Sequence, residues 1–200
     1  NCFVFLESPH DKATILRMLR DRTEAELPQN VPVLLRYFDS RVFVALLRTL
    51  NERQARAFLS AGTRWAVPGR HGQGVLFGRE TDAPEMSHEA PFKFDPAQEA
   101  ALIDAGEADA LVDLLLDQNN AVLEVLLPPE QHERIVAALE VGRTLHIDQV
   151  GDQAAFCSLA LELGPSFHED DLWAVWKPDL RSGRMTFSEV VERVIGSAKV

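Results

Sequence analysis

The chain has 200 residues, of which 46% are hydrophobic and 26% are charged, and this composition is typical of a globular protein with a sizeable core. It contains no apolar run approaching the roughly 18 to 20 residues that cross a bilayer, and its first ten residues lack the features of a signal peptide. We therefore expect a soluble, cytoplasmic protein that has no membrane partner.

The net charge of −11 is unevenly divided along the chain. Residues 1–80 hold 12 Lys and Arg against 8 Asp and Glu, whereas residues 81–200 hold 8 against 23. An acidic segment repels polyanions, which argues against nucleic acid as a partner and favours a basic or apolar protein surface. The alternative interpretation is that acidic helices only keep the chain soluble. Cys2 and Cys157 are predicted to be buried free thiols, in agreement with a reducing compartment.

The first elements predict an α/β arrangement. Residues 2–6 have the pattern of a short buried strand, and the apolar spacing after them predicts a helix ending near Arg22. A polar connection over residues 24–30 leads to a second buried strand over residues 31–38 and a helix over residues 40–50. This β-α-β-α order is typical of an α/β layer.

A compact charged segment lies between the second strand and its helix. It contains Arg36, Asp39, Ser40 and Arg41, and either Asp39 or Ser40 is placed to cap the helix. One interpretation is structural, with Asp39 as the cap and one arginine in a local ion pair. The other is an exposed binding corner, because guanidinium groups bind carboxylates and phosphates.

A third helix and two short strands follow the charged segment. Asn51 and Gln54 are spaced as a capping pair for the helix, and residues 63–67 and 74–77 are strand candidates. The glycine-rich connection between these strands lacks the lysine and the Ser or Thr of a phosphate-binding loop, so a hairpin turn is predicted in preference to a nucleotide site.

Residues 81–95 are polar and predict a linker. The linker would join an α/β lobe, residues 1–80, to an acidic all-α lobe, residues 96–200. The predicted fold class is therefore α+β, with a small sheet and packed helices in the first lobe. His88 and Glu89 lack a second His or Cys at ligand spacing, and we predict neither a metal nor another cofactor.

Helices are predicted throughout the second lobe, and one of them carries two tryptophans. Trp173 and Trp176 are three residues apart and share a helical face, which predicts either core packing or contacts with a partner. The acidic residues around them lack the spacing and the glycine of a calcium loop. In the last helix, Thr186 and Glu189 form a capping box. The sequence contains no nucleophile elbow, zinc motif or Cys/His/Asn set, so we do not expect an enzyme.

The run from residue 36 to residue 65 resembles the core motif of the type VI secretion effector chaperone (adaptor) family, whose members share the DUF4123 domain. That family shows an Arg-aromatic-aromatic-Asp-Pro-Arg turn, a Leu-rich helix, a Gln-containing helix and a Trp. The corresponding residues here are Arg36, Tyr37, Phe38, Asp39, Arg41, Leu46, Leu47, Gln54 and Trp65.

The chain departs from the family pattern at three places. Ser40 replaces the usual Pro, which leaves the turn less rigid, and Met18 stands where a His often precedes Leu-Arg. The family's usual segment upstream of the first strand is also missing, so we expect the chain to be a fragment.

The resemblance implies a non-catalytic adaptor. Such a protein binds a secreted toxin effector in the cytoplasm and helps load it onto the VgrG spike of the secretion machine. The expected partner-binding residues are Arg36, Asp39 and Arg41, with Trp173 and Trp176 as further contacts. The alternatives are an immunity protein that neutralises a basic toxin with the acidic lobe, and an enzyme that uses the arginine corner on an anionic substrate.

Overall fold

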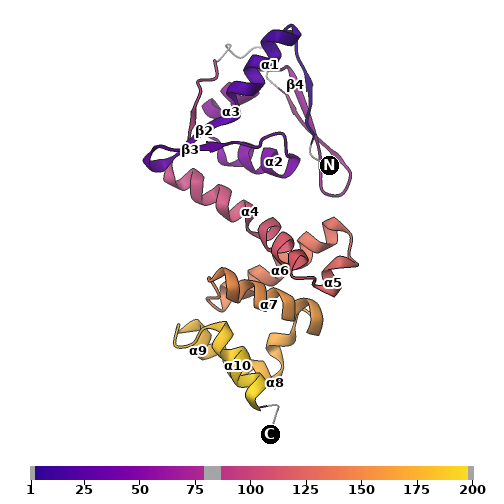
Figure 1. Cartoon of the computed structure of the whole chain (residues 1–200), viewed down its shortest axis with the longest axis vertical. Coiled ribbons are helices and arrows are strands. Elements are labelled where there is room, and N and C mark those ends of the chain that lie inside the picture. The colour runs from indigo at the N-terminus through magenta and orange to yellow at the C-terminus, as the bar shows by residue number, and fades with distance from the viewer. Residues whose placement is uncertain (1–2, 79–86, 198–200) are drawn as a thin grey trace. The chain divides into compact units, whose positions relative to one another are not determined.

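The computed structural model describes residues 3–78 and 87–197 (Figure 1). It divides into two compact units, Asn1–Gly106 and Glu107–Val200, and each is considered by itself. The predicted α+β class is confirmed, because the first unit contains two three-stranded sheets and the second contains only helices. None of the helices in the described part of the chain combines the length and the hydropathy needed to span a bilayer. Cys2 and residues 81–86 of the predicted linker lie outside the described residues.

The first unit holds both sheets and the helices that pack on them. Its elements are β1 (Phe5–Glu7), α1 (Lys12–Asp21), β2 (Glu24–Leu27), the 3₁₀ turn η1 (Pro28–Asn30), β3 (Val31–Leu34), α2 (Ser40–Thr49), α3 (Glu52–Leu59), β4 (Arg64–Pro68), β5 (Gly74–Gly78), β6 (Phe92–Lys93) and the start of α4 (Pro96–Asp117).

The strands form two separate sheets in place of the single sheet that the sequence predicts. One is antiparallel with the order β1-β4-β5, and the other has the order β3-β2-β6, in which β2 pairs antiparallel with β3 and parallel with β6. The predicted β-α-β-α layer is therefore wrong, because β1 and β3 belong to different sheets. The predicted hairpin is confirmed: Gly69 donates from its amide to the carbonyl of Gln73 at 2.6 Å, and Gly72 takes φ +81° in the turn.

Three strand boundaries differ from those predicted. Residues 24–27, predicted as a polar connection, form β2, whose Ala25 is buried against the core. β3 ends at Leu34, four residues early, because the chain already turns toward α2 there. β1 begins at Phe5, and the description of it as buried is wrong for one of its faces.

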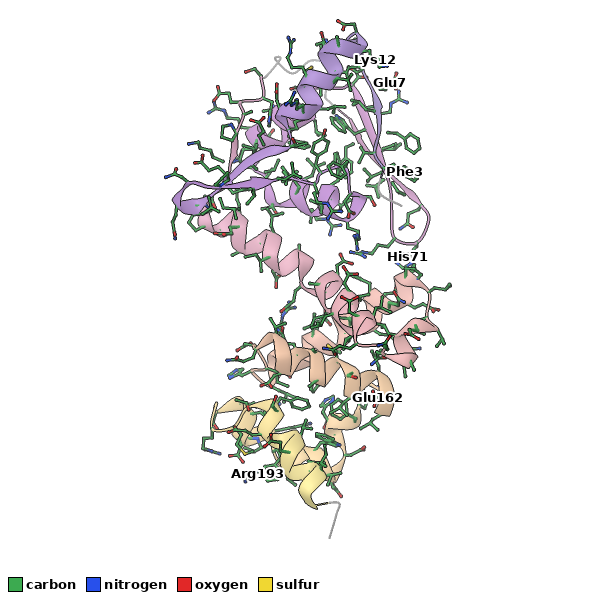
Figure 2. The ribbon with its side chains drawn as sticks, in the orientation of Figure 1. Phe3, Glu7, Lys12, His71, Glu162 and Arg193 are labelled. Atoms are coloured by element: carbon green, nitrogen blue, oxygen red, sulfur yellow. The ribbon has the colours of Figure 1, made fainter. Side chains whose placement is uncertain are left out.

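The outer face of the β1-β4-β5 sheet is apolar and exposed. Phe5, Ala66 and Leu76 lie in register across it, and Phe5 and Leu76 are 64% and 69% exposed. Phe3 packs edge-to-face on Phe5 on the same side (Figure 2). Only the alternate residues of β1, such as Leu6, turn toward the core, as the two-residue period of a strand requires.

The core of the first unit is built from aromatic rings. Trp65 lies 5.4 Å from Phe43 and 6.2 Å from Phe58, measured between ring centroids, and all three side chains are buried. Phe43 and Leu46 form the buried face of α2, as the apolar spacing predicts.

The described part of the predicted linker belongs to the first unit. Phe92 and Phe94 are buried in its core, and β6 pairs with β2. The boundary between the units falls after Gly106, inside the continuous helix α4, rather than in residues 81–95.

The second unit is helical, as predicted. After the remainder of α4 it contains α5 (Ala121–Glu124), α6 (Pro128–Thr144), α7 (Val150–Leu163), the 3₁₀ turn η2 (Phe167–Glu169), α8 (Asp171–Ala174), α9 (Lys177–Arg181) and α10 (Phe187–Ser197). Its core centres on Leu115, Ile135 and Phe156, which are almost fully buried. Asp152 of α7 is also buried and accepts hydrogen bonds from the backbone amides of Phe187 and Ser188, so that it caps α10 from another helix.

Candidate partner-binding surface

Asp39 forms the structural centre of the charged corner. Its carboxylate caps α2 by accepting a hydrogen bond from the backbone amide of Arg41 at 3.0 Å. The same carboxylate accepts two further bonds from the Arg41 side chain, from Nε at 3.1 Å and from Nη2 at 2.9 Å. Asp39 is 3% exposed. The structure therefore contains both interactions that the structural interpretation expects. Asp39 caps the helix, and Arg41 forms the local ion pair with it.

The residues before Asp39 alternate between the core and the surface. Leu35 and Tyr37 are buried, and the Tyr37 hydroxyl donates to the carbonyl of Leu19 at 2.9 Å. Burial raises the pKa of Tyr37 to about 12, and nearby Arg22 offsets part of that rise. Arg36 and Phe38 point the other way and are exposed. The motif thus contributes one set of side chains to the fold and another to the surface.

The exposed set is called the motif surface here and consists of Arg36, Phe38 and Arg41. Arg36 forms no ion pair within residues 3–78 and 87–197. Arg41 keeps 42% of its side chain exposed although it binds Asp39. The exposed Phe38 ring and the exposed Arg36 guanidinium are side chains of types that are enriched at protein interfaces.

The two predicted tryptophan contacts are half-buried and packed against the second core. Trp173 stands edge-on to Phe167 with a centroid distance of 5.2 Å, and it stacks on Phe187 at 6.1 Å. The guanidinium of Arg193, whose position Figure 2 labels, lies over the ring of Trp176 at 5.4 Å from the ring centroid. A role in partner binding remains a prediction for both.

Sequence reasoning missed two exposed apolar residues next to these tryptophans. Leu172 and Val175 are three residues apart and more than half exposed. Asp170 and Asp171 precede them, and both carboxylates lie at the surface. The sequence shows the three-residue spacing of Leu172 and Val175. In so short a helix, however, the apolar pattern does not predict which face is exposed and which is buried.

Sequence reasoning also missed Arg22, which is 1% exposed. Its guanidinium donates to the carbonyls of Phe58 at 2.6 Å, Met18 at 2.6 Å and Ala57 at 3.1 Å, and to Ser60 Oγ at 2.9 Å. Burial lowers the pKa of Arg22 to about 10. The arginine therefore caps the carbonyl end of α3, where the helix dipole favours a cation.

His88, considered above as a metal ligand, packs between aromatic rings. Its ring stacks on Phe92 and stands edge-on to Phe58, and its Nε2 is buried without a hydrogen-bond partner among the residues that the structure describes. Burial, followed by the charge of Arg22, lowers its pKa. The residues that the structure describes contain no group of three or more His, Cys, Asp or Glu arranged to hold a metal ion.

The division at Gly106 alters the distribution of charge. The first unit, residues 1–106, holds 13 Lys and Arg against 14 Asp and Glu, a net charge of −1. The second unit holds 7 against 17, a net charge of −10. The acidic character thus lies in the helical unit, while the excess of cations is confined to residues 1–80.

Comparison with known proteins finds a family model that matches the start of the chain. Residues 1–57 match the family model described as Domain of unknown function (DUF4123). The matched segment extends from before β1 into α3 and includes the whole charged corner. This match supports the DUF4123 family that the sequence resembles. No curated protein and no solved structure matches the chain.

Proposed function

We propose that the chain is a non-enzymatic adaptor that binds a type VI secretion effector and helps load it onto the VgrG spike. The proposal starts from two sequence similarities, which overlap over residues 36–57. The motif from residue 36 to residue 65 resembles that of the effector chaperones, and the DUF4123 model matches residues 1–57.

The observation that carries the proposal is the alternation within the motif. The side chains of Tyr37 and Asp39 form hydrogen bonds within the fold, so folding alone accounts for the presence of these two residues in the motif. Arg36 and Phe38 are exposed, and the contact that Phe38 does make is an edge-on packing of its ring against Tyr37, with 6.1 Å between the ring centroids. A motif that retains an exposed arginine and an exposed phenylalanine beside its structural residues is suited to contact another protein.

The state of Asp39 favours binding over chemistry at this corner. A general base must lie within hydrogen-bond reach of a substrate proton. Asp39 is instead buried, and three donors of Arg41 occupy its oxygens. The exposed guanidinium of Arg36, three residues before Asp39 in the chain, can hold an anionic group on a partner without taking part in a reaction.

The second unit offers a chemically different surface for a second partner. Its net charge of −10 attracts basic surfaces and repels acidic ones. The exposed pair Leu172 and Val175 adds apolar area beside Asp170 and Asp171. An adaptor requires two such surfaces that do not compete for the same partner.

Affinity purification with the effector and spike proteins encoded beside the gene tests the function. The tagged chain should capture both proteins. The double variant Arg36→Ala/Phe38→Ala should lose one of them by about tenfold while remaining folded, with only a small fall in melting temperature from the lost contact between the rings of Phe38 and Tyr37. Arg53→Ala is the matched control, since Arg53 is also exposed and forms no ion pair within the described residues.

The alternatives give different results in the same experiment. An immunity protein would capture a toxin through its acidic unit and would not capture the spike. An enzyme acting on an anionic substrate would capture neither protein. If the double variant still captured both partners, the motif surface would not be a partner-binding surface.

A further inference from the structure

The outer face of α1 carries cations that nothing in the described chain neutralises. Lys12, Arg17 and Arg20 are exposed, and none of them forms an ion pair within residues 3–78 and 87–197. Other cations of the first unit do pair: Arg41 with Asp39, and Lys93 with Glu26.

The carboxylates at the two ends of α1 do not compensate these charges. Asp11 is the N-cap of α1, and its carboxylate accepts hydrogen bonds from the backbone amide and the hydroxyl of Thr14. Asp21, four residues after Arg17, forms no ion pair with it in the described chain, and α1 holds no acid between Lys12 and Arg20. Arg17 and Arg20 are three residues apart, a spacing at which like charges repel and destabilise a helix.

An exposed leucine lies among the cations. Lys12, Leu16 and Arg20 follow one another at intervals of four residues and therefore share one face, with Arg17 beside them (Figure 2 labels Lys12 at the first turn). Leu16 is 57% exposed, while Met18 and Leu19 pack against the core of the first unit. The face spans roughly 12 Å along the helix axis, at about 1.5 Å per residue.

We infer that this face, defined by Lys12, Leu16, Arg17 and Arg20 and called the α1 face, docks an acidic amphipathic helix of a partner protein. A helix with an apolar residue opposite Leu16 and three acids opposite Lys12, Arg17 and Arg20 matches the α1 face charge for charge and covers Leu16. The ion pairs then remove the repulsion between Arg17 and Arg20, and they gain strength as the apolar contact excludes water.

The chemistry of the face distinguishes a protein partner from other anionic ones. A nucleic acid or an anionic membrane would also attract three cations. The chain as a whole carries a net charge of −11, which opposes both of these extended anionic surfaces. A short acidic helix carries few charges and meets only the local cationic face.

Binding of a synthetic peptide to the full chain tests the inference directly, without any natural partner. The probe is a fluorescent helical peptide of about 15 residues, with glutamates on either side of a central leucine, and its lysine-for-glutamate counterpart is the control peptide. We expect the chain to bind the acidic peptide and not the basic one. The affinity should fall about tenfold between roughly 0.05 and 0.3 M salt, because the screening length shortens over that range.

Variants then locate the binding. Arg17→Glu/Arg20→Glu should weaken it about tenfold or more, and Leu16→Ala by about threefold. The matched control is Arg48→Glu/Arg53→Glu, since both arginines are exposed and form no ion pair in the described chain. Circular dichroism melting shows that each variant is folded.

Four results would overturn the inference. The first is a peptide affinity of the Arg17→Glu/Arg20→Glu variant within twofold of that of the unaltered chain. The second is an equal loss of peptide affinity in the Arg48→Glu/Arg53→Glu control. The third is tighter binding to a duplex of about 20 base pairs or to phosphatidylserine vesicles than to the peptide. The last is salt-sensitive self-association of the chain that Arg17→Glu/Arg20→Glu abolishes, since a second copy would then occupy the face.

Discussion

The guanidinium of Arg22 donates from Nε to the backbone carbonyl of Phe58 at 2.6 Å and so joins the end of α1 to the last turn of α3. Trp65 completes this arrangement by donating from its indole Nε1 to the carbonyl of Leu59 at 3.0 Å. Side chains from two other elements therefore satisfy consecutive carbonyls that a helix end leaves without partners.

Replacement of Arg22 by methionine should strongly destabilise the first unit. Methionine fills much of the same volume, but it leaves the buried carbonyls of Ala57 and Phe58 without these donors. We expect the free energy of unfolding to fall by about 3 kcal/mol, as measured by urea denaturation. Arg17→Met, at an exposed position of the same helix, should change it by less than about 0.5 kcal/mol. A similar small change for Arg22→Met would show that water replaces these donors.

Variants of Asp39 separate its capping role from its charge. Asp39→Asn keeps an oxygen that can accept the Arg41 amide but loses the charge-assisted pair, so we expect a loss of about 1 kcal/mol. Asp39→Ala removes both interactions in a buried place and should lose about 2 to 3 kcal/mol. Thermal melting measured in parallel with partner capture is the test. Full stability with lost capture would reassign Asp39 to partner contact.

Tyr37 should titrate far above the ordinary pKa of tyrosine. It is the only tyrosine in the chain, so the absorbance of tyrosinate reports on it alone. The folded pKa of about 12 exceeds the unfolded value of about 10, so the unfolded state releases its proton first. Stability that Tyr37 contributes below pH 10 is therefore lost as the pH rises from 10 to 12. An absorbance midpoint near pH 10 with unchanged circular dichroism would contradict the burial of its hydroxyl.

Two glycine-to-alanine substitutions should act in opposite directions. A Cβ on Gly62 would lie 2.6 Å from the carbonyl oxygen of Glu7 and would also strike the Leu6 side chain, so we expect a loss of about 1 to 3 kcal/mol. A Cβ on Gly106 would meet nothing within 4 Å, and Gly106 lies inside α4. Gly106→Ala should gain about 0.5 to 1 kcal/mol from helix propensity. Chemical denaturation of both variants checks the contrast, and equal signs would refute it.

Local chemistry made the helix starts predictable. The Asn51 side chain accepts from the Gln54 amide, and Gln54 accepts in return from the Asn51 amide, so the capping pair anticipated for α3 is present. Thr186 and Glu189 form the corresponding box at α10. Such signals depend on residues three positions apart, and a sequence shows them directly.

The strands and the buried arginine depended on distant residues instead. β2 has the sequence Glu-Ala-Glu-Leu, which has weak strand propensity, and it is held by β3 and by β6, whose Phe92 pairs with Ala25 from nearly 70 residues away. Arg22 is buried only because the end of α3 lies beside it, and arginine without such partners is almost always exposed. Within the motif, the sequence indicated the Asp39 cap and one ion pair but could not separate the exposed residues from the buried ones.

The closeness of Tyr37 and Trp65 gives the first unit a spectroscopic signature of its own. Their ring centroids are 6.4 Å apart, a distance at which an excited phenol transfers its energy to an indole before it can emit. The tyrosine fluorescence of the native chain should therefore be quenched. Because the second unit contains tryptophan and no tyrosine, recovery of that emission in denaturant reports the opening of the first unit alone.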